Sequence, residues 1–213
     1  GTIRVGNATL AVAADGDIDN VVALSSAAST VNTGGNDVAL FGVVSGEGTL
    51  NKTGSGTLTL AGANEFAGGL AINDGTVRAA GDANVGTGAI SIGNATLAVT
   101  ADGTIDNGVA LSSGQSTVNT GGNNVALSGA VSGAGTLNKT GSGMLLLNGT
   151  NSQAATIVRG GTLIAATNEA LGASDGDLTI GADSRFLTGQ NMAISQRLHV
   201  AGDNAVFDTG ANN

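Results

Sequence analysis

The feature that most constrains the fold of this 213-residue chain is an internal repeat with an offset of 87 residues. Residues 29–56 and residues 116–143 are identical at 24 of 28 positions. The same offset relates shorter segments before and after this match. A fixed period of this length is typical of repeat architectures, in which each unit packs only on its neighbours.

Three units follow from this offset. The first unit spans residues 1–87, the second spans residues 88–175, and a partial, diverged third unit occupies residues 176–213. In that third unit, residues 205–213 correspond to the segment that begins at Ser116. We expect the units to form one continuous array, and we interpret the chain as a segment of a longer array.

Short stretches that alternate apolar with polar or small residues predict β-strands, bounded by Gly, Asn and Asp residues that favour turns. Such stretches lie at residues 57–60, 70–73, 76–79 and 89–92. One glycine-free stretch, residues 17–33, is compatible with a helix. Its equivalent in the second unit carries Gly108 and Gly114, each of which costs about 1 kcal/mol in a helix interior. Because near-identical copies share a structure, we predict strands there as well.

The composition selects among the all-β architectures. Sandwiches and propellers usually anchor their sheets with Trp and Tyr, and this chain has neither, with four Phe as its only aromatic residues. A solenoid needs only stacked aliphatic side chains inside. We predict a right-handed parallel β-helix of about ten coils without significant helix. Four coils of about 20 residues would form each unit, giving a rod roughly 45–50 Å long.

Within this rod, alternation predicts that four leucines of equivalent strands point inward. They are Leu58, Leu60, Leu145 and Leu147. Recurring Asn and Thr residues are expected to form hydrogen-bonded ladders between coils.

The charge and residue content exclude several classes of function. Sixteen acidic and seven basic side chains give a net charge of −9. Scattered cations without Tyr or Trp argue against a nucleic-acid partner. The absence of Cys excludes disulfides and thiolate metal sites. No apolar run approaches the roughly 20 residues of a membrane-spanning helix, so we expect no direct membrane insertion of this segment.

Two segments carry a more specific motif. Residues 46–64 followed by residues 68–77 read G-x-G-x-L-x-K-x-G-x-G-x-L-x-L, an Asn-containing turn, an aromatic residue and a G-T-V ending. Residues 133–151 followed by residues 156–163 repeat this pattern. Both resemble the passenger-associated transport repeat, also called the autotransporter-associated β-strand repeat. The second copy departs from the pattern.

The departures concern two positions. Gln153 stands where the first copy has Phe66, and Met144 replaces Thr57. A packing role for the aromatic residue is therefore not expected in the second copy.

The resemblance implies the passenger region of a Gram-negative autotransporter adhesin. Such a passenger is a β-helical stalk that type V secretion exports through an outer-membrane barrel to the cell surface or beyond. The absence of Cys agrees with a chain that is threaded unfolded through a narrow pore.

His199 is the only histidine, and its neighbours in sequence, Ser195 and Asp203, are the residues with which a catalytic triad would be conceivable. The G-x-S-x-G motif of hydrolases is absent. We interpret His199 as an exposed strand or turn residue.

Asp15, Asp17 and Asp19 place three carboxylates at alternate positions, as at the start of a calcium-binding loop. Ser26 occupies the twelfth position, where such a loop needs a bidentate Glu, and the second unit has Thr104 between Asp102 and Asp106. We therefore interpret these aspartates as parts of Asp-Gly turns rather than as metal ligands.

Lys52 and Lys139 occupy equivalent positions, with Glu47 near the first and Ala134 in its place near the second. A glycan-cleaving β-helix would cluster such charges in one groove, but a catalytic residue repeated in each unit would be unusual. We interpret the two lysines as solvated charges on one face of the rod that discourage lateral sheet pairing. Recurring Asn-x-Thr triplets are interpreted as ladder or turn residues rather than glycosylation sites. They begin at Asn7, Asn51, Asn94, Asn138 and Asn148.

These observations favour an extracellular structural and adhesive stalk over an enzyme. We predict no catalytic residue, no cofactor and no metal site, and as partner either a second copy of the protein or a host or abiotic surface. Two alternatives remain open: a secretion or folding spacer without a ligand, and part of a glycan-active β-helix whose site lies outside this segment.

Overall fold

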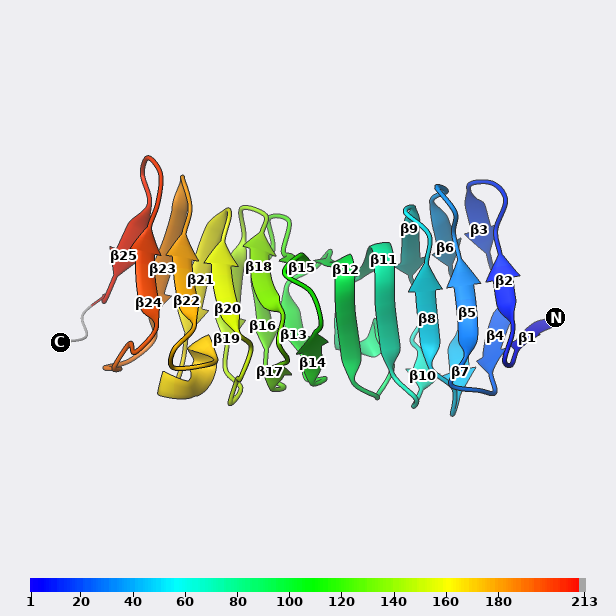
Figure 1. Cartoon of the computed structure of the whole chain (residues 1–213). Coiled ribbons are helices and arrows are strands. Elements are labelled where there is room, and N and C mark those ends of the chain that lie inside the picture. The colour runs from blue at the N-terminus through cyan, green and yellow to red at the C-terminus, as the bar shows by residue number, and fades with distance from the viewer. Residues whose placement is uncertain (211–213) are drawn as a thin grey trace.

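The computed structural model describes residues 1–210 as a rod of about ten turns of parallel strands, with its first and last turns at opposite ends (Figure 1). The predicted all-β parallel solenoid is thereby confirmed. Residues 211–213, which complete the predicted third copy of the repeat, lie outside the described residues. Ten strands follow one another along the longest sheet path, which corresponds to a length of about 43 Å at the ordinary strand spacing.

Each turn contributes to three faces, which we call A, B and C. Face A contains, in order along the rod, β1 (Thr2–Val5), β4 (Val21–Leu24), β7 (Val44–Gly46), β10 (Glu65–Phe66), the 3₁₀ turn η1 (Asp82–Asn84), β13 (Gly103–Ile105), β16 (Val125–Leu127), β19 (Met144–Leu147), β21 (Gly161–Ala165), β23 (Ser184–Thr188) and β25 (Val206–Asp208).

Face B contains β2 (Thr9–Ala11), β5 (Ser29–Asn32), β8 (Leu50–Thr53), the first parts of β11 (Leu70–Ala79) and β12 (Ile90–Val99), β14 (Val109–Leu111), β17 (Val131–Ser132) and then the 3₁₀ turn η2 (Asn168–Leu171).

Face C contains β3 (Gly16–Ile18), β6 (Val38–Leu40), β9 (Thr57–Leu60), the second parts of β11 and β12, β15 (Ser116–Asn119), β18 (Thr136–Thr140), β20 (Ala155–Val158), β22 (Asp177–Ile180) and β24 (Arg197–Val200). The stretch at residues 17–33 forms strands on all three faces, as predicted.

The core is a set of aliphatic columns that run along the rod axis. Leu58, for example, is in register with Val38 on one side and Val77 on the other, and all three are buried. Leu58, Leu60, Leu145 and Leu147 all point inward, as the alternation predicts. Each buried Leu side chain contributes about 1.5–3 kcal/mol by leaving water.

The 87-residue repeat does not contain a whole number of turns. The register ladder from Thr9 takes four turns to reach Ser91, which is 82 residues later, whereas the repeat equivalent of Thr9 is Thr96. Thr96 lies one corner further along the chain, on face C, while Thr9 lies on face B. The expected four coils per unit are therefore four and one third, and equivalent residues of successive units lie on adjacent faces.

Asparagine side chains form hydrogen bonds between neighbouring turns, and their acceptors are backbone carbonyl oxygens. Asn51 Nδ2 donates to the carbonyl oxygens of Ala27 at 3.0 Å and Ser29 at 3.2 Å. Asn138 repeats this arrangement with Gly114 at 3.0 Å and Ser116 at 3.3 Å. A carbonyl has two lone pairs, so it accepts such a bond in addition to its sheet bond.

Candidate functional site

Both lysines of the chain are buried in the core, which corrects the prediction that they are solvated charges on one face. Lys52 lies in the aliphatic column between Val31 and Ile72, and Lys139 lies between Val118 and Val158 in a different column. All six side chains are fully buried. Because the repeat advances by four and one third turns, Lys52 belongs to face B and Lys139 belongs to face C.

The lysine ammonium groups are held by the turns that follow their strands. Lys139 Nζ donates to the carbonyl oxygens of Gly141 at 2.8 Å, Gly160 at 2.9 Å and Thr140 at 3.1 Å, and it contacts Thr120 Oγ1 at 3.1 Å. The turn needs a glycine because Gly141 has a φ of 84°. The ammonium group thus joins three successive turns, through the Thr120 hydroxyl on one side and the carbonyls of Thr140, Gly141 and Gly160 on the other.

Lys52 repeats this arrangement in the first unit. Its Nζ donates to the carbonyl oxygens of Gly54 at 2.6 Å, Asp74 at 3.1 Å and Thr53 at 3.2 Å. Burial lowers the pKa of Lys52, and the nearby Asp74 carboxylate opposes that shift. Burial lowers the pKa of Lys139 to about 8. The sequence contained an indication that Lys52 is buried: it stands two residues after Leu50, and residues two apart in a strand share a face.

The other candidate residues have structural partners. Asp15 Oδ1 accepts a bond from the backbone N–H of Asp37 at 2.8 Å, and Asp102 Oδ1 repeats this with Asn124 at 2.8 Å. These carboxylates therefore join the Asp-Gly turns to the next turn of the rod. Within residues 1–210, no group of three or more His, Asp and Glu side chains is placed to hold a metal ion.

The remaining aspartates and Glu47 also lie at the surface. Asp17, Asp19 and Asp106 are exposed, as is Glu47. Of the Asn-x-Thr positions, Asn7 has a positive φ of 40° in its turn, and Asn94 and Asn148 are exposed.

His199 is exposed on β24, as predicted, and its Nε2 lies 3.3 Å from Asp177 Oδ1. That carboxylate also accepts a bond from Arg197 Nε at 2.7 Å, and this bond is the main cause that lowers the pKa of Asp177. The structure does not bring His199 together with Ser195 or Asp203.

Gln153 replaces Phe66 at the same interior position. Both side chains are fully buried, and each lies against a glycine, Gly172 for Gln153 and Gly86 for Phe66. Gln153 Nε2 donates to Thr156 Oγ1 at 3.0 Å, while its Oε1 lacks a partner among the described residues. The second unit thus places a buried polar side chain where the first unit has a buried aromatic ring.

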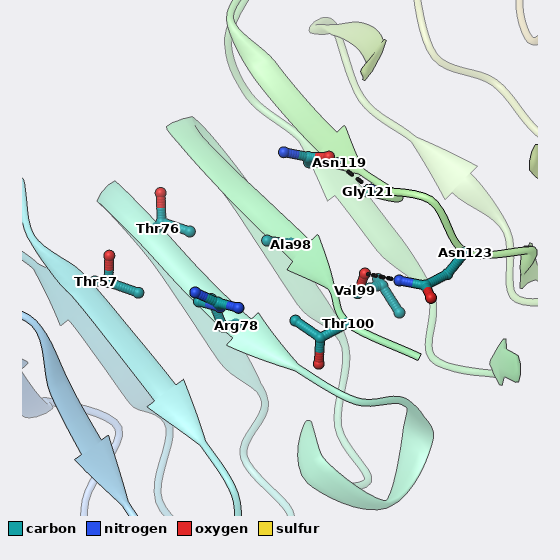
Figure 2. A pocket seen from close by; sticks show the side chains of 9 residues that line it. All are labelled: Thr57, Thr76, Arg78, Ala98, Val99, Thr100, Asn119, Gly121 and Asn123. Carbon is teal, nitrogen blue, oxygen red and sulfur yellow. Dashed lines mark hydrogen bonds between the residues drawn. The ribbon is translucent and has the colours of Figure 1, made fainter. Parts of the chain in front are cut away.

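A groove on face C is a feature that the sequence interpretation missed. It encloses about 460 Å³ and crosses β9, β11, β12 and β15 (Figure 2). Its lining consists of Thr57, Thr76, Arg78, Ala98, Val99, Thr100, Asn119, Gly121 and Asn123. The small side chain of Ala98 lies between Arg78 and Asn119 in the strand register and leaves the hollow between them. The outward alternation of Arg78 and Ala98 was visible in the sequence, but the concavity depends on the neighbouring turns.

The two segments that contain the buried lysines match a known family of repeats. The sequence model of the passenger-associated transport repeat matches residues 50–79 and residues 137–165. The chain carries two passenger-associated transport repeats. Each repeat begins in the strand that carries the buried lysine and includes the three strands that follow. The first repeat thus runs from β8 to β11, and the second runs from β18 to β21. No curated protein and no solved structure matches the chain.

The repeat explains what the buried lysine does in the fold. In each passenger-associated transport repeat, the Lys-x-Gly turn carries carbonyls that hold the ammonium group, and a residue of the next turn of the rod, Asp74 or Gly160, supplies a further carbonyl. The repeats and the β-solenoid fold together indicate an autotransporter passenger stalk, which implies exposure outside the cell or at its surface. Among the described residues, no helix has the length and apolar character needed to span a membrane.

Proposed function

We propose that this passenger segment is an adhesive stalk that mediates self-association or attachment to host or abiotic surfaces. The observation that carries the proposal is the repetition of outward polar side chains along an uninterrupted rod. Thr57, Thr76, Thr96 and Thr117, for example, follow one another in register over four turns of face C. Linked weak contacts can raise the strength of binding by about 10²–10⁴ over a single contact.

The advance of four and one third turns supports a particular form of this proposal. Successive units turn the same surface by one face, so three units, or thirteen turns, present it in all three directions. A stalk of this kind would engage a partner from any side, whereas a whole number of turns would confine contacts to one side.

We propose in addition that the segment is not an enzyme. Support comes from the surroundings of the candidate residues, since His199 pairs with Asp177 and the two lysines are enclosed by carbonyls. A spacer without a ligand is the second candidate, and the continuous core that extends the rod is the observation that favours it.

The test is to display one, two or three 87-residue units on a bacterium that does not aggregate, at equal surface density. Adhesion predicts that settling and surface attachment rise with the number of units and become stronger as salt screens the net charge of −9. A display of equal length made from an unrelated rigid repeat is the matched control. If the three-unit array neither settles cells nor attaches them to any surface, the adhesive proposal fails and the spacer is favoured.

A further inference from the structure

Arg78 stands apart from the other basic residues of the rod. Lys52 and Lys139 are enclosed by carbonyls, Arg159 donates to Asn138 Oδ1 at 3.1 Å, and two further arginines pair with aspartates. Of the Lys and Arg side chains within residues 1–210, only those of Arg4 and Arg78 have no hydrogen-bonded or ionic partner. Of these two, Arg78 lines the groove on face C (Figure 2). It is therefore a cation that is available to a ligand.

The rest of the groove consists of hydroxyl and amide groups. Thr57 and Thr76 present side-chain hydroxyls that are without a partner in the described part of the chain, while Asn119 and Asn123 use one end of each amide internally. Asn119 Oδ1 accepts the Gly121 N–H at 2.8 Å, and Asn123 Nδ2 donates to the Val99 carbonyl at 3.1 Å. The opposite ends leave the Asn119 NH2 group as a donor and Asn123 Oδ1 as an acceptor for a ligand.

The groove has no carboxylate in its lining, although the chain as a whole is acidic. Two aspartates that border the groove accept backbone N–H bonds, Asp37 from Thr57 at 3.2 Å and Asp102 from Asn124 at 2.8 Å. Neither carboxylate is paired with Arg78. Arg78 is the one cation of the lining and therefore the group that would hold an anion.

We propose that this groove binds an anionic saccharide chain, with Arg78 holding a carboxylate or sulfate group and the Thr and Asn side chains holding ring hydroxyls. The inference rests on the adhesive function proposed above and names the chemistry of its target. A guanidinium group can hold two oxygen atoms of a carboxylate or a sulfate group through two parallel N–H···O bonds. The groove crosses four strands, or about 14 Å, which suits a short stretch of an extended polysaccharide lying along the rod.

A peptide or nucleic-acid ligand fits the groove less well. The groove lies on a sheet face whose strands are already paired on both sides, so an extended peptide cannot add backbone hydrogen bonds there. A nucleic acid would need several cations or stacking aromatic residues, and the lining has one cation and no aromatic residue. Hydroxyl-rich ligands remain the best match.

The charge of the groove belongs to the first unit alone. Ile164 occupies the position of Arg78 in the second unit, because Arg78 pairs with Thr59 and Ile164 pairs with Leu146 in the same register. Arg78→Ile therefore introduces a residue that the fold already accepts at this position. It removes the cation with little risk to folding.

The test is isothermal titration calorimetry of the 213-residue chain with three probes: a galacturonic acid hexamer, a heparin-derived hexasaccharide and neutral maltohexaose. We expect saturable binding of one or both anionic probes, weaker at high salt, and none of maltohexaose. The two anionic arms distinguish carboxylate from sulfate recognition. Arg78→Ile should weaken binding about 10- to 100-fold, the loss expected for one hydrogen-bonded charge.

Two further variants complete the design. Arg4→Ala removes the other unpartnered arginine, outside the groove, and should leave binding unchanged. Ala98→Glu places a carboxylate beside Arg78 and should abolish binding, while circular dichroism and melting temperature report on the fold. The proposal is overturned if neither anionic probe binds, if maltohexaose binds as tightly as the anionic probes, or if Arg78→Ile binds like the wild type. Cell settling is measured in a separate experiment, so a failure of saccharide binding can be distinguished from a failure of the adhesive function.

Discussion

The two buried lysines predict an unusual dependence of stability on pH. The chain contains no Tyr and no Cys, so Lys52 and Lys139 are its only side chains whose ordinary pKa lies near 10.5. In the folded rod the pKa of Lys139 is about 8, compared with an ordinary value of 10.5. In that window the unfolded chain holds a proton that the folded chain has released.

The sign of the effect follows from this difference. Stability rises with pH wherever the unfolded state binds more protons than the folded state. Lys139 should therefore stabilise the rod progressively between about pH 8 and 10.5, with a slope approaching 1.4 kcal/mol per pH unit and a total of about 3 kcal/mol. Lys52 adds an effect of the same sign, because its pKa is also lowered.

Guanidinium unfolding at about pH 7.5, 9 and 10.5, followed by far-UV circular dichroism, would measure this dependence of stability on pH. Lys139→Met removes its share of the slope, Lys52→Met removes the other share, and the double variant supplies the baseline. At neutral pH each single variant also leaves carbonyls without their donor, which costs about 1–3 kcal/mol for each group that water does not reach. A wild-type stability that stays flat or falls from pH 8 to 10.5, or a Lys139→Met slope equal to that of the wild type, refutes the buried placement of the ammonium groups.

Three other substitutions test the packing of the rod. Leu58→Asp buries an unpaired charge in an aliphatic column and should cost several kcal/mol, whereas Thr59→Asp on the outward side should change the melting temperature little; equal effects would mean that the register is wrong. Gly56→Ala would place a Cβ 2.0 Å from the Asn36 carbonyl oxygen and should destabilise the rod by about 1–3 kcal/mol, while Gly114→Ala, with open space around it, should be neutral in the same thermal melts. Gln153→Phe combined with Thr156→Leu recreates the buried Phe66 and Leu70 pair of the first unit and removes an unpartnered amide oxygen. Chemical denaturation should therefore show a free energy of unfolding that is higher by about 1–3 kcal/mol. A lower value would show that Gln153 has a role that an aromatic ring cannot fill.

The sequence by itself determined the solenoid. An 87-residue repeat, short alternating strands and the absence of Trp and Tyr leave few folds other than stacked coils, and alternation alone placed Leu58 and Leu145 in the core. Local patterns suffice here because each coil packs only on its neighbours. The same locality made the passenger-associated transport repeat recognisable from its motif.

The tertiary structure decided what the charged residues do. Lys52 and Lys139 read as surface charges because a lysine is rarely buried, and only the folded turns bring enough carbonyls to one point to hold an ammonium group. The third of a turn by which each unit advances was also hidden, because it depends on how many residues each corner consumes across four turns. The groove around Arg78 has the same origin: its walls come from strands up to three turns apart, whose register is fixed only when the coils stack.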